Sequence, residues 1–159
     1  EPDHPELEPL RQQLLNIYAN GIANKTRLFP GMAELLNSIE TAGMNWGVVT
    51  NKPAWLTTPL LDALQLSQRA VSIVSGDTLA ERKPHPSPLL YACDQAGSQG
   101  FECVYVGDAE RDIVAGNKAG MKTIVALFGY IGTKDKPETW GADALLDSPQ
   151  AISQWLQLN

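Results

Sequence analysis

Short apolar runs alternate along the chain with segments whose apolar residues recur at helical spacing. The apolar runs predict buried strands at 45–50, 70–75, 101–106, 122–127 and 142–146. Apolar residues three and four positions apart predict helices at about 5–24, from 32 to a stop at Gly43, from 53 to 64, from 88 to 95 with a stop at Gly97, through Ala119, and at 150–158. The expected buried face of the 53–64 helix is Trp55, Leu56, Leu60, Leu61 and Leu64. Such alternation favours parallel strands joined by crossover helices. The expected fold class is therefore α/β, a doubly wound (Rossmann-like) parallel sheet with helices on both faces.

Composition narrows the class of ligand. The chain has 159 residues, of which 43% are hydrophobic, enough for one domain with a substantial core. The formal charge is −6 and the basic residues are scattered, so we expect no nucleic-acid partner and no anionic membrane surface. No 18-residue apolar run and no signal-peptide pattern occurs, which favours a soluble, cytoplasmic protein. A small diffusing substrate is the expected partner.

Several common catalytic patterns are absent from the sequence. There is no Cys/His metal motif, no glycine-rich nucleotide loop and no serine nucleophile elbow. Cys93 and Cys103 are expected to be reduced packing residues, and His4 and His85 to be exposed. The 129–132 loop is not a dinucleotide fingerprint and is expected to rim the ligand crevice.

Two carboxylates, Asp108 and Asp112, stand where a predicted strand ends and the next helix begins. Ligands of open α/β sheets bind in the crevice beyond the carboxyl ends of the strands. Residues four apart share a helix face, so both carboxylates can serve a hard cation such as Mg²⁺. The alternative interpretation is that Asp108 caps the helix and Asp112 favours its positive end.

Polar residues also follow the two preceding strands. Thr50 and Asn51 offer a hydroxyl, an amide and the N–H groups of the helix opening at Pro53, all suited to phosphate oxygens, although they could simply cap that helix. Lys83 lies in the segment 82–88, which three prolines at alternate positions stiffen. A lysine held in this way can place a point charge on a phosphate, whereas a solvated turn lysine is the simpler alternative.

Three segments together carry a family resemblance. Residues 48–53, 76–86 and 106–112 resemble the second, third and fourth motifs of the haloacid dehalogenase superfamily of phosphatases, in the right order and each after a predicted strand. Within that superfamily the chain most resembles phosphoglycolate phosphatase-like enzymes. The runs 126–131 and 140–143 also resemble a bacterial branch that acts on N-acetylmuramic acid 6-phosphate.

The resemblance implies a role for each site residue. Thr50 and Asn51 would bind the substrate phosphate, and Lys83 would neutralise the phosphate and the nucleophile. Asp108 would bind Mg²⁺, and Asp112 would support it by holding the metal shell or Lys83. The implied activity is Mg²⁺-dependent hydrolysis of a small phosphorylated metabolite, phosphoglycolate or a sugar phosphate, through an aspartyl phosphate.

The first motif of the superfamily, Asp-x-Asp at the end of the central strand, occurs nowhere in the 159 residues. The resemblance then divides the chain into a remnant of a helical cap, 1–28, and a core domain, 29–159, that lacks its first strand. Loss of a central strand exposes ladder groups, so we expect the gap to be filled by a segment outside this chain, by rearrangement or by a second copy in a homodimer. The chain alone is expected to be inactive.

Two other functions fit parts of the pattern. The absent Asp-x-Asp favours a non-catalytic α/β module that binds phosphate or a partner, but such a module has no evident need for four retained site residues, Thr50, Lys83, Asp108 and Asp112. A phosphorylated signalling receiver shares the acidic crevice, but its acceptor aspartate should end an early strand, where this chain has Thr50. The hydrolase interpretation is therefore preferred.

Overall fold

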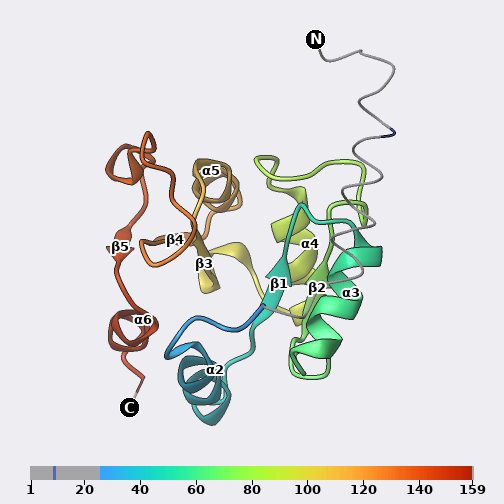
Figure 1. Ribbon diagram of the computed structural model, residues 1–159, viewed down its shortest axis with the longest axis horizontal. Helices are drawn as coiled ribbons and strands as arrows, with labels where there is room; N and C mark the ends of the chain where they lie inside the picture. The colour runs from blue at the N-terminus through green and yellow to red at the C-terminus, as the bar shows by residue number, and fades with distance from the viewer. Residues whose placement is uncertain (1–8, 10–25, 159) are drawn as a thin grey trace.

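The computed structural model describes residue 9 and residues 26–158 (Figure 1). The predicted helix at 5–24 lies almost wholly outside the described residues, as does the proposed cap remnant at 1–28. The strands are β1 (Gly47–Val49), β2 (Ser72–Val74), β3 (Val104–Gly107), β4 (Lys122–Ala126) and β5 (Ala144–Leu146). The helices are α2 (Met32–Thr41), α3 (Ala54–Ala63), α4 (Ser87–Ala96), α5 (Glu110–Lys118) and α6 (Pro149–Trp155), with 3-10 turns η1 (Gly100–Glu102) and η2 (Pro137–Thr139).

All strand pairs are parallel, as the alternation of strands and helices predicts, but the strands form two sheets. One sheet pairs β1 with β2, and the other has the order β3-β4-β5. In the part of the chain that the structure describes, no backbone ladder joins β1 to β3, although the two strands face each other across the middle of the molecule (Figure 1). The carboxyl ends of both strands consequently open onto the same region.

On one face of the molecule, helix α2 packs against both sheets. Its neighbouring residues Leu35 and Leu36 are both buried but belong to different clusters. Leu35 packs with Ile124 of β4 and Ile152 of α6. Leu36 packs with Leu61 of α3 and with side chains of β1 and β2. A single turn of α2 therefore bridges the two sheets.

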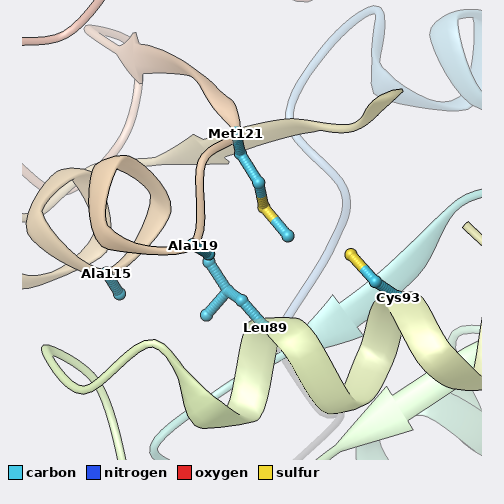
Figure 2. Close-up of a cluster of buried hydrophobic side chains, with 5 residues drawn as sticks. All are labelled: Leu89, Cys93, Ala115, Ala119 and Met121. Atoms are coloured by element: carbon cyan, nitrogen blue, oxygen red, sulfur yellow. The ribbon is translucent and has the colours of Figure 1, made fainter. Parts of the chain in front are cut away.

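The opposite face is covered by α4 and α5 (Figure 2). The buried cluster between these helices contains Leu89, Cys93, Ala115, Ala119 and Met121. Val49 of β1 and Tyr105 of β3 pack against it, so this cluster also spans both sheets. Cys93 and Cys103 are free thiols with sulfur atoms 3.6 Å apart.

Two large side chains lie outside the elements or faces expected for them. Trp55 was expected on the buried face of α3 but is 44% exposed, because the buried face runs through Leu56 and Leu61. Phe101 was expected to begin a strand but is 76% exposed in η1. The reason is local: Glu102 accepts a hydrogen bond from the Gln99 amide at 2.8 Å, which closes a turn before the strand can start.

The helix stops at Gly43 and Gly97 are confirmed, since both residues follow helices with positive φ values of 73° and 67°. This is the conformation that glycine adopts without steric cost. None of the helices in the described ranges is long and apolar enough to span a bilayer.

Candidate active site

The buried ammonium of Lys83 lies where the carboxyl ends of β1 and β3 meet. Its Nζ is 2.9 Å from Asp112 Oδ1, and it donates hydrogen bonds of 2.8 Å to the carbonyl oxygen of Val49 and to Tyr105 Oη. Lys83 is 8% exposed. Lysine side chains are rarely this buried, and a buried charge needs partners that replace its water. The partners of Lys83 come from β1, β3 and α5.

Asp112 reaches Lys83 from the first turn of α5. Its Oδ2 accepts a hydrogen bond of 3.2 Å from the amide of Ala109 at the helix start. Its Oδ1 has no well-directed hydrogen bond among the described residues, so its contact with Lys83 is an ion pair. Gly107 makes room for this arrangement, because a Cβ at that position would lie 2.7 Å from Asp112 Oδ2. Of the two supporting roles considered for Asp112, the geometry shows contact with Lys83.

The side chain of Asn51 holds the backbone of Lys83. Its Oδ1 accepts a 3.1 Å hydrogen bond from the Lys83 amide, and its Nδ2 donates a 2.9 Å hydrogen bond to the Lys83 carbonyl. Gly76 permits the approach, since any Cβ there would clash with the backbone of Asn51. Both polar atoms of the Asn51 side chain are thus engaged with Lys83, which fixes the base of the lysine.

Thr50 follows β1 directly, and its Oγ1 accepts a 3.1 Å hydrogen bond from the amide of Lys52. The hydroxyl also carries a proton that it can donate to a ligand. The nearby N-terminus of α3 was expected to offer N–H groups to phosphate. However, the amide of Ala54 already donates to Asp77 Oδ1 at 2.8 Å. The amide of Ala54 is therefore engaged, whereas the hydroxyl proton of Thr50 has no acceptor among the described residues.

Asp108 directly follows β3, and its side chain contacts the loop after β4. Its Oδ2 accepts a 2.8 Å hydrogen bond from the amide of Tyr130, and a Cβ on Gly129 would clash with the Asp108 side chain. No described residue donates to Asp108 Oδ1. The carboxylate lines a cavity of about 540 Å³ together with Ala109, Glu110, Arg111, Tyr130, Asp135 and Trp140. Of the 129–132 loop, Tyr130 lines this cavity, and a role of the loop at the ligand crevice stays a prediction.

The donor set fits Mg²⁺, which takes one or two carboxylates and fills its remaining positions with water and substrate phosphate. Asp108 has one oxygen anchored by the Tyr130 amide and one without a donor among the described residues. Within residues 26–158, no three His, Cys, Asp or Glu side chains converge into a complete metal site. Asp108 would therefore hold the ion with ligands from outside its own cluster.

Tyr105 is the functional neighbour that the sequence analysis missed. It lies in β3, donates a 3.0 Å hydrogen bond to the Val49 carbonyl and accepts one from Lys83. Burial raises the pKa of its hydroxyl well above the ordinary value, and the charges of Asp112 and Asp108 raise it further. A tyrosine in an otherwise apolar strand, shortly before Asp108, was the available signal.

The histidine predictions have separate outcomes. His85 is exposed, as expected, with Nδ1 3.0 Å from Ser87 Oγ. His4 lies outside the described residues.

Comparison with known proteins identifies the family. A family model described as "Haloacid dehalogenase-like hydrolase" matches residues 2–126. The chain is 43% identical over 150 residues to an N-acetylmuramic acid 6-phosphate phosphatase from Pseudomonas aeruginosa, covering 94% of this chain. It is 46% identical over 145 residues to a phosphoglycolate phosphatase from Xanthomonas campestris, covering 91% of this chain. The chain spans 66% of the length of each of these relatives.

A solved structure shares the fold. The crystal structure of a predicted phosphoglycolate phosphatase from Haemophilus somnus 129PT superposes with a TM-score of 0.85 at 29% identity, covering 92% of this chain and 64% of that one. The three motif segments, their placement after parallel strands and these matches agree. The chain belongs to the haloacid dehalogenase-like hydrolase family.

Proposed function

We propose that this chain supplies most of the active site of a Mg²⁺-dependent phosphomonoester hydrolase. The observation that carries the proposal is the buried ammonium of Lys83, ion-paired to Asp112 and placed at the joint end of β1 and β3. Burying a charge that could otherwise lie in water costs free energy, which is expected at a functional site. A fixed cation at the carboxyl ends of parallel strands suits a phosphate ligand.

Each site residue has a role in this proposal. Thr50 donates its hydroxyl proton to a phosphate oxygen, and Lys83 neutralises charge on the phosphate and on the attacking group. Asn51 and Asp112 position Lys83 through the contacts described above. Asp108 holds Mg²⁺, which when bound stabilises negative charge on the phosphoryl oxygens.

We further propose that the nucleophile is an aspartate on a strand that pairs between β1 and β3, which no backbone ladder joins among the described residues. Its carboxylate oxygen would bond to phosphorus while the bond from phosphorus to the ester oxygen breaks. The departing alkoxide takes a proton from an acid beside the nucleophile, and the same group then takes a proton from the attacking water. Water then attacks the aspartyl phosphate, which releases inorganic phosphate and regenerates the carboxylate.

The proposed substrate class is based on the names of the related proteins. They are named as phosphatases of phosphoglycolate and of N-acetylmuramic acid 6-phosphate, both small phosphomonoesters. Because this chain spans 66% of their length, the activity is proposed for the longest form that its gene encodes.

The test is release of inorganic phosphate from both compounds by that longest form and by the 159-residue chain. We expect hydrolysis by the longest form, loss of activity on chelation of divalent cations and recovery with Mg²⁺. The 159-residue chain is expected to release none.

The second candidate, a non-catalytic phosphate-binding module, is favoured by the absence of Asp-x-Asp from the sequence. The same assay separates the two functions. A folded longest form that binds phosphate but hydrolyses no phosphomonoester would overturn the hydrolase and support the module. The mass of the 159-residue chain in solution, measured in parallel, tests whether this chain forms a homodimer.

A further inference from the structure

The thiols of Cys93 and Cys103 are in direct contact. The Cys93 thiol donates to Cys103 Sγ with the two sulfur atoms 3.6 Å apart, and both cysteines are free. We propose that this pair is a redox modification site, at which a low-molecular-weight disulfide such as oxidised glutathione converts the two thiols into an intramolecular disulfide. The new bond joins α4 to the segment that enters β3.

Hydrogen-bonded turns hold the two cysteines in this arrangement. Cys93 lies near the end of α4, and its carbonyl accepts a 2.9 Å hydrogen bond from the Ser98 amide, just after the helix stop at Gly97. The amide of Cys103 donates a 3.0 Å hydrogen bond to the Gly100 carbonyl, which closes the turn before β3. The sulfur atoms must approach from 3.6 Å to about 2.05 Å for a bond to form. The backbone therefore already brings the thiols close to bonding distance.

The two thiols differ in their access to a reagent. Cys103 is half-buried and follows the exposed residues Phe101 and Glu102, so a small disulfide can reach its sulfur. Cys93 is 6% exposed and projects from α4 into the buried cluster between the helices (Figure 2). Burial, then the neighbouring thiol, raises the pKa of Cys93 to about 12, which disfavours the reactive thiolate. Cys103 is therefore the attacking thiol, and Cys93 completes the exchange.

The exchange with oxidised glutathione has two steps. The Cys103 thiolate attacks one sulfur of the reagent, the S–S bond of glutathione breaks, and the first glutathione leaves as a thiolate. Cys93 then loses its proton to solvent and attacks the Cys103 sulfur, which releases the second glutathione. The protein gives up two electrons and two protons, and one oxidised glutathione becomes two reduced ones.

The disulfide links two sheets that no backbone ladder joins among the described residues. Helix α4 packs against β1 and β2, whereas Cys103 directly precedes β3, which pairs with β4. The bond is apolar and lies against an apolar cluster, so its burial leaves no polar group without a partner. Oxidation should therefore stabilise the folded protein, because the cross-link restricts the unfolded chain.

The test exposes the longest encoded form to oxidised glutathione and maps its peptides. Trypsin leaves both cysteines in one peptide, 83–111, because it cuts after Arg82 and Arg111 but not between Lys83 and Pro84. We expect this peptide to lose the mass of two hydrogen atoms, to regain it with a reductant, and to carry no glutathione. The melting temperature of the oxidised protein should rise by about 4 °C or more, as expected for a cross-link in a domain of this size.

Two single variants separate the steps. Cys93→Ser removes the thiol that completes the exchange and should leave glutathione attached to Cys103. Cys103→Ser removes the attacking thiol and should leave Cys93 unmodified. Neither variant should show the rise in melting temperature. Glutathione on Cys93 in Cys103→Ser, at the rate seen for Cys103 in Cys93→Ser, would overturn the assigned order of attack.

The urea-unfolded chain is the control for chance pairing of the two thiols. The equilibrium constant for disulfide formation with glutathione should be about tenfold or more larger in the folded protein than in urea. Equal constants, lasting glutathione on Cys103 of the native protein, or an unchanged melting temperature would overturn the proposal. Phosphatase activity enters none of these measurements, so this inference and the proposed function stand or fall separately.

Discussion

Lys83 and Asp112 form an ion pair in which Nζ and Oδ1 are 2.9 Å apart and both side chains are 8% exposed. The lysine comes from the loop after β2 and the aspartate from α5, so the pair joins segments that belong to the two separate sheets. The ammonium of Lys83 also donates hydrogen bonds to the Val49 carbonyl and to Tyr105 Oη. The candidate site is thus also a structural link between the sheets.

Breaking this pair should strongly destabilise the fold. Lys83→Met or Asp112→Asn alone leaves one buried polar group without compensation, and we expect each to lower the free energy of unfolding by roughly 3–5 kcal/mol. The double variant should lose less than the sum of the two, because neither charge is then left alone. Urea denaturation measures all three values.

The exposed pair of Lys122 and Asp143 supplies the control for that cycle. Its Nζ and Oδ1 lie 2.7 Å apart, but the lysine side chain is 63% exposed. Lys122→Met should therefore cost only about 0–1 kcal/mol. Equal losses at Lys83 and Lys122 would contradict the structural role assigned to the buried pair.

Removing the side-chain amide of Asn51 should make the backbone of Lys83 less firmly held. Asn51→Ala leaves the Lys83 amide and carbonyl without their side-chain partners, and we expect a loss of about 1–3 kcal/mol in the free energy of unfolding. Asn37, which is exposed and accepts a hydrogen bond from Arg69, provides a matched Asn37→Ala control with a loss of about 0.5 kcal/mol or less. Comparable losses in the two variants would refute the positioning role of Asn51.

The close approach of Gly129 to Asp108 predicts a selective effect on cation binding. Gly129→Ala should displace the carboxylate and weaken Mg²⁺ binding by about tenfold or more, since its Cβ would lie 2.7 Å from Asp108 Oδ2. Calorimetric titration with Mg²⁺ measures this change. Gly97→Ala is the control, because it strains the backbone at a positive φ but has nothing within 4 Å of the added Cβ. Unchanged Mg²⁺ binding in Gly129→Ala would speak against Asp108 as the ligand.

Cys93 predicts a loss of stability at alkaline pH. Burial, then the neighbouring Cys103, raises the pKa of the Cys93 thiol from about 9 to about 12. Between these values the unfolded chain releases the proton that the folded chain keeps. Unfolding is therefore favoured as the pH rises above about 9, and the lost stability is fully present below that pH. Urea midpoints at pH 8 and pH 10.5 should differ more in the native protein than in Cys93→Ala, and equal differences would exclude this thiol as the cause.

Much of the fold could be predicted from hydrophobic spacing, because each strand is a short apolar run between amphipathic helices. The stops at Gly43 and Gly97 were visible for the same local reason, the tolerance of glycine for positive φ. The exposure of Trp55 and Phe101 was not predictable from spacing, because it depends on which turn of a helix meets the sheet and on the turn closed by Glu102. The structure brings Lys83 and Asp112 together, while the catalytic roles of both remain predictions.

The finer geometry of the site lay beyond sequence reasoning. The amide side chain of Asn51 suggested that this residue binds phosphate. Only the tertiary structure shows that both polar atoms of the side chain contact the Lys83 backbone. The contact of Tyr105 with Lys83 crosses from one sheet to the other, so no local pattern encodes it.

Spacing predicted Asp108 and Asp112 on one helix face, which was wrong, because α5 begins at Glu110 with Ala109 as its N-cap and Asp108 lies before it. Spacing also could not show that Asp112 pairs with Lys83 while Asp108 contacts the Tyr130 amide.

The most direct test of the central claim compares two aspartates that make the same kind of backbone contact. Asp108 and Asp143 each accept a 2.8 Å hydrogen bond from an amide, that of Tyr130 and that of Thr123. An asparagine keeps a carbonyl oxygen for this bond at either position, so neither variant removes the acceptor. In the longest encoded form, Asp108→Asn should lower kcat/KM for Mg²⁺-dependent phosphate release by about 100-fold or more, as expected for lost charge stabilisation of a transition state, while Asp143→Asn should stay within about twofold. Equal activity of the two variants would contradict the assignment of Asp108 to the catalytic cation.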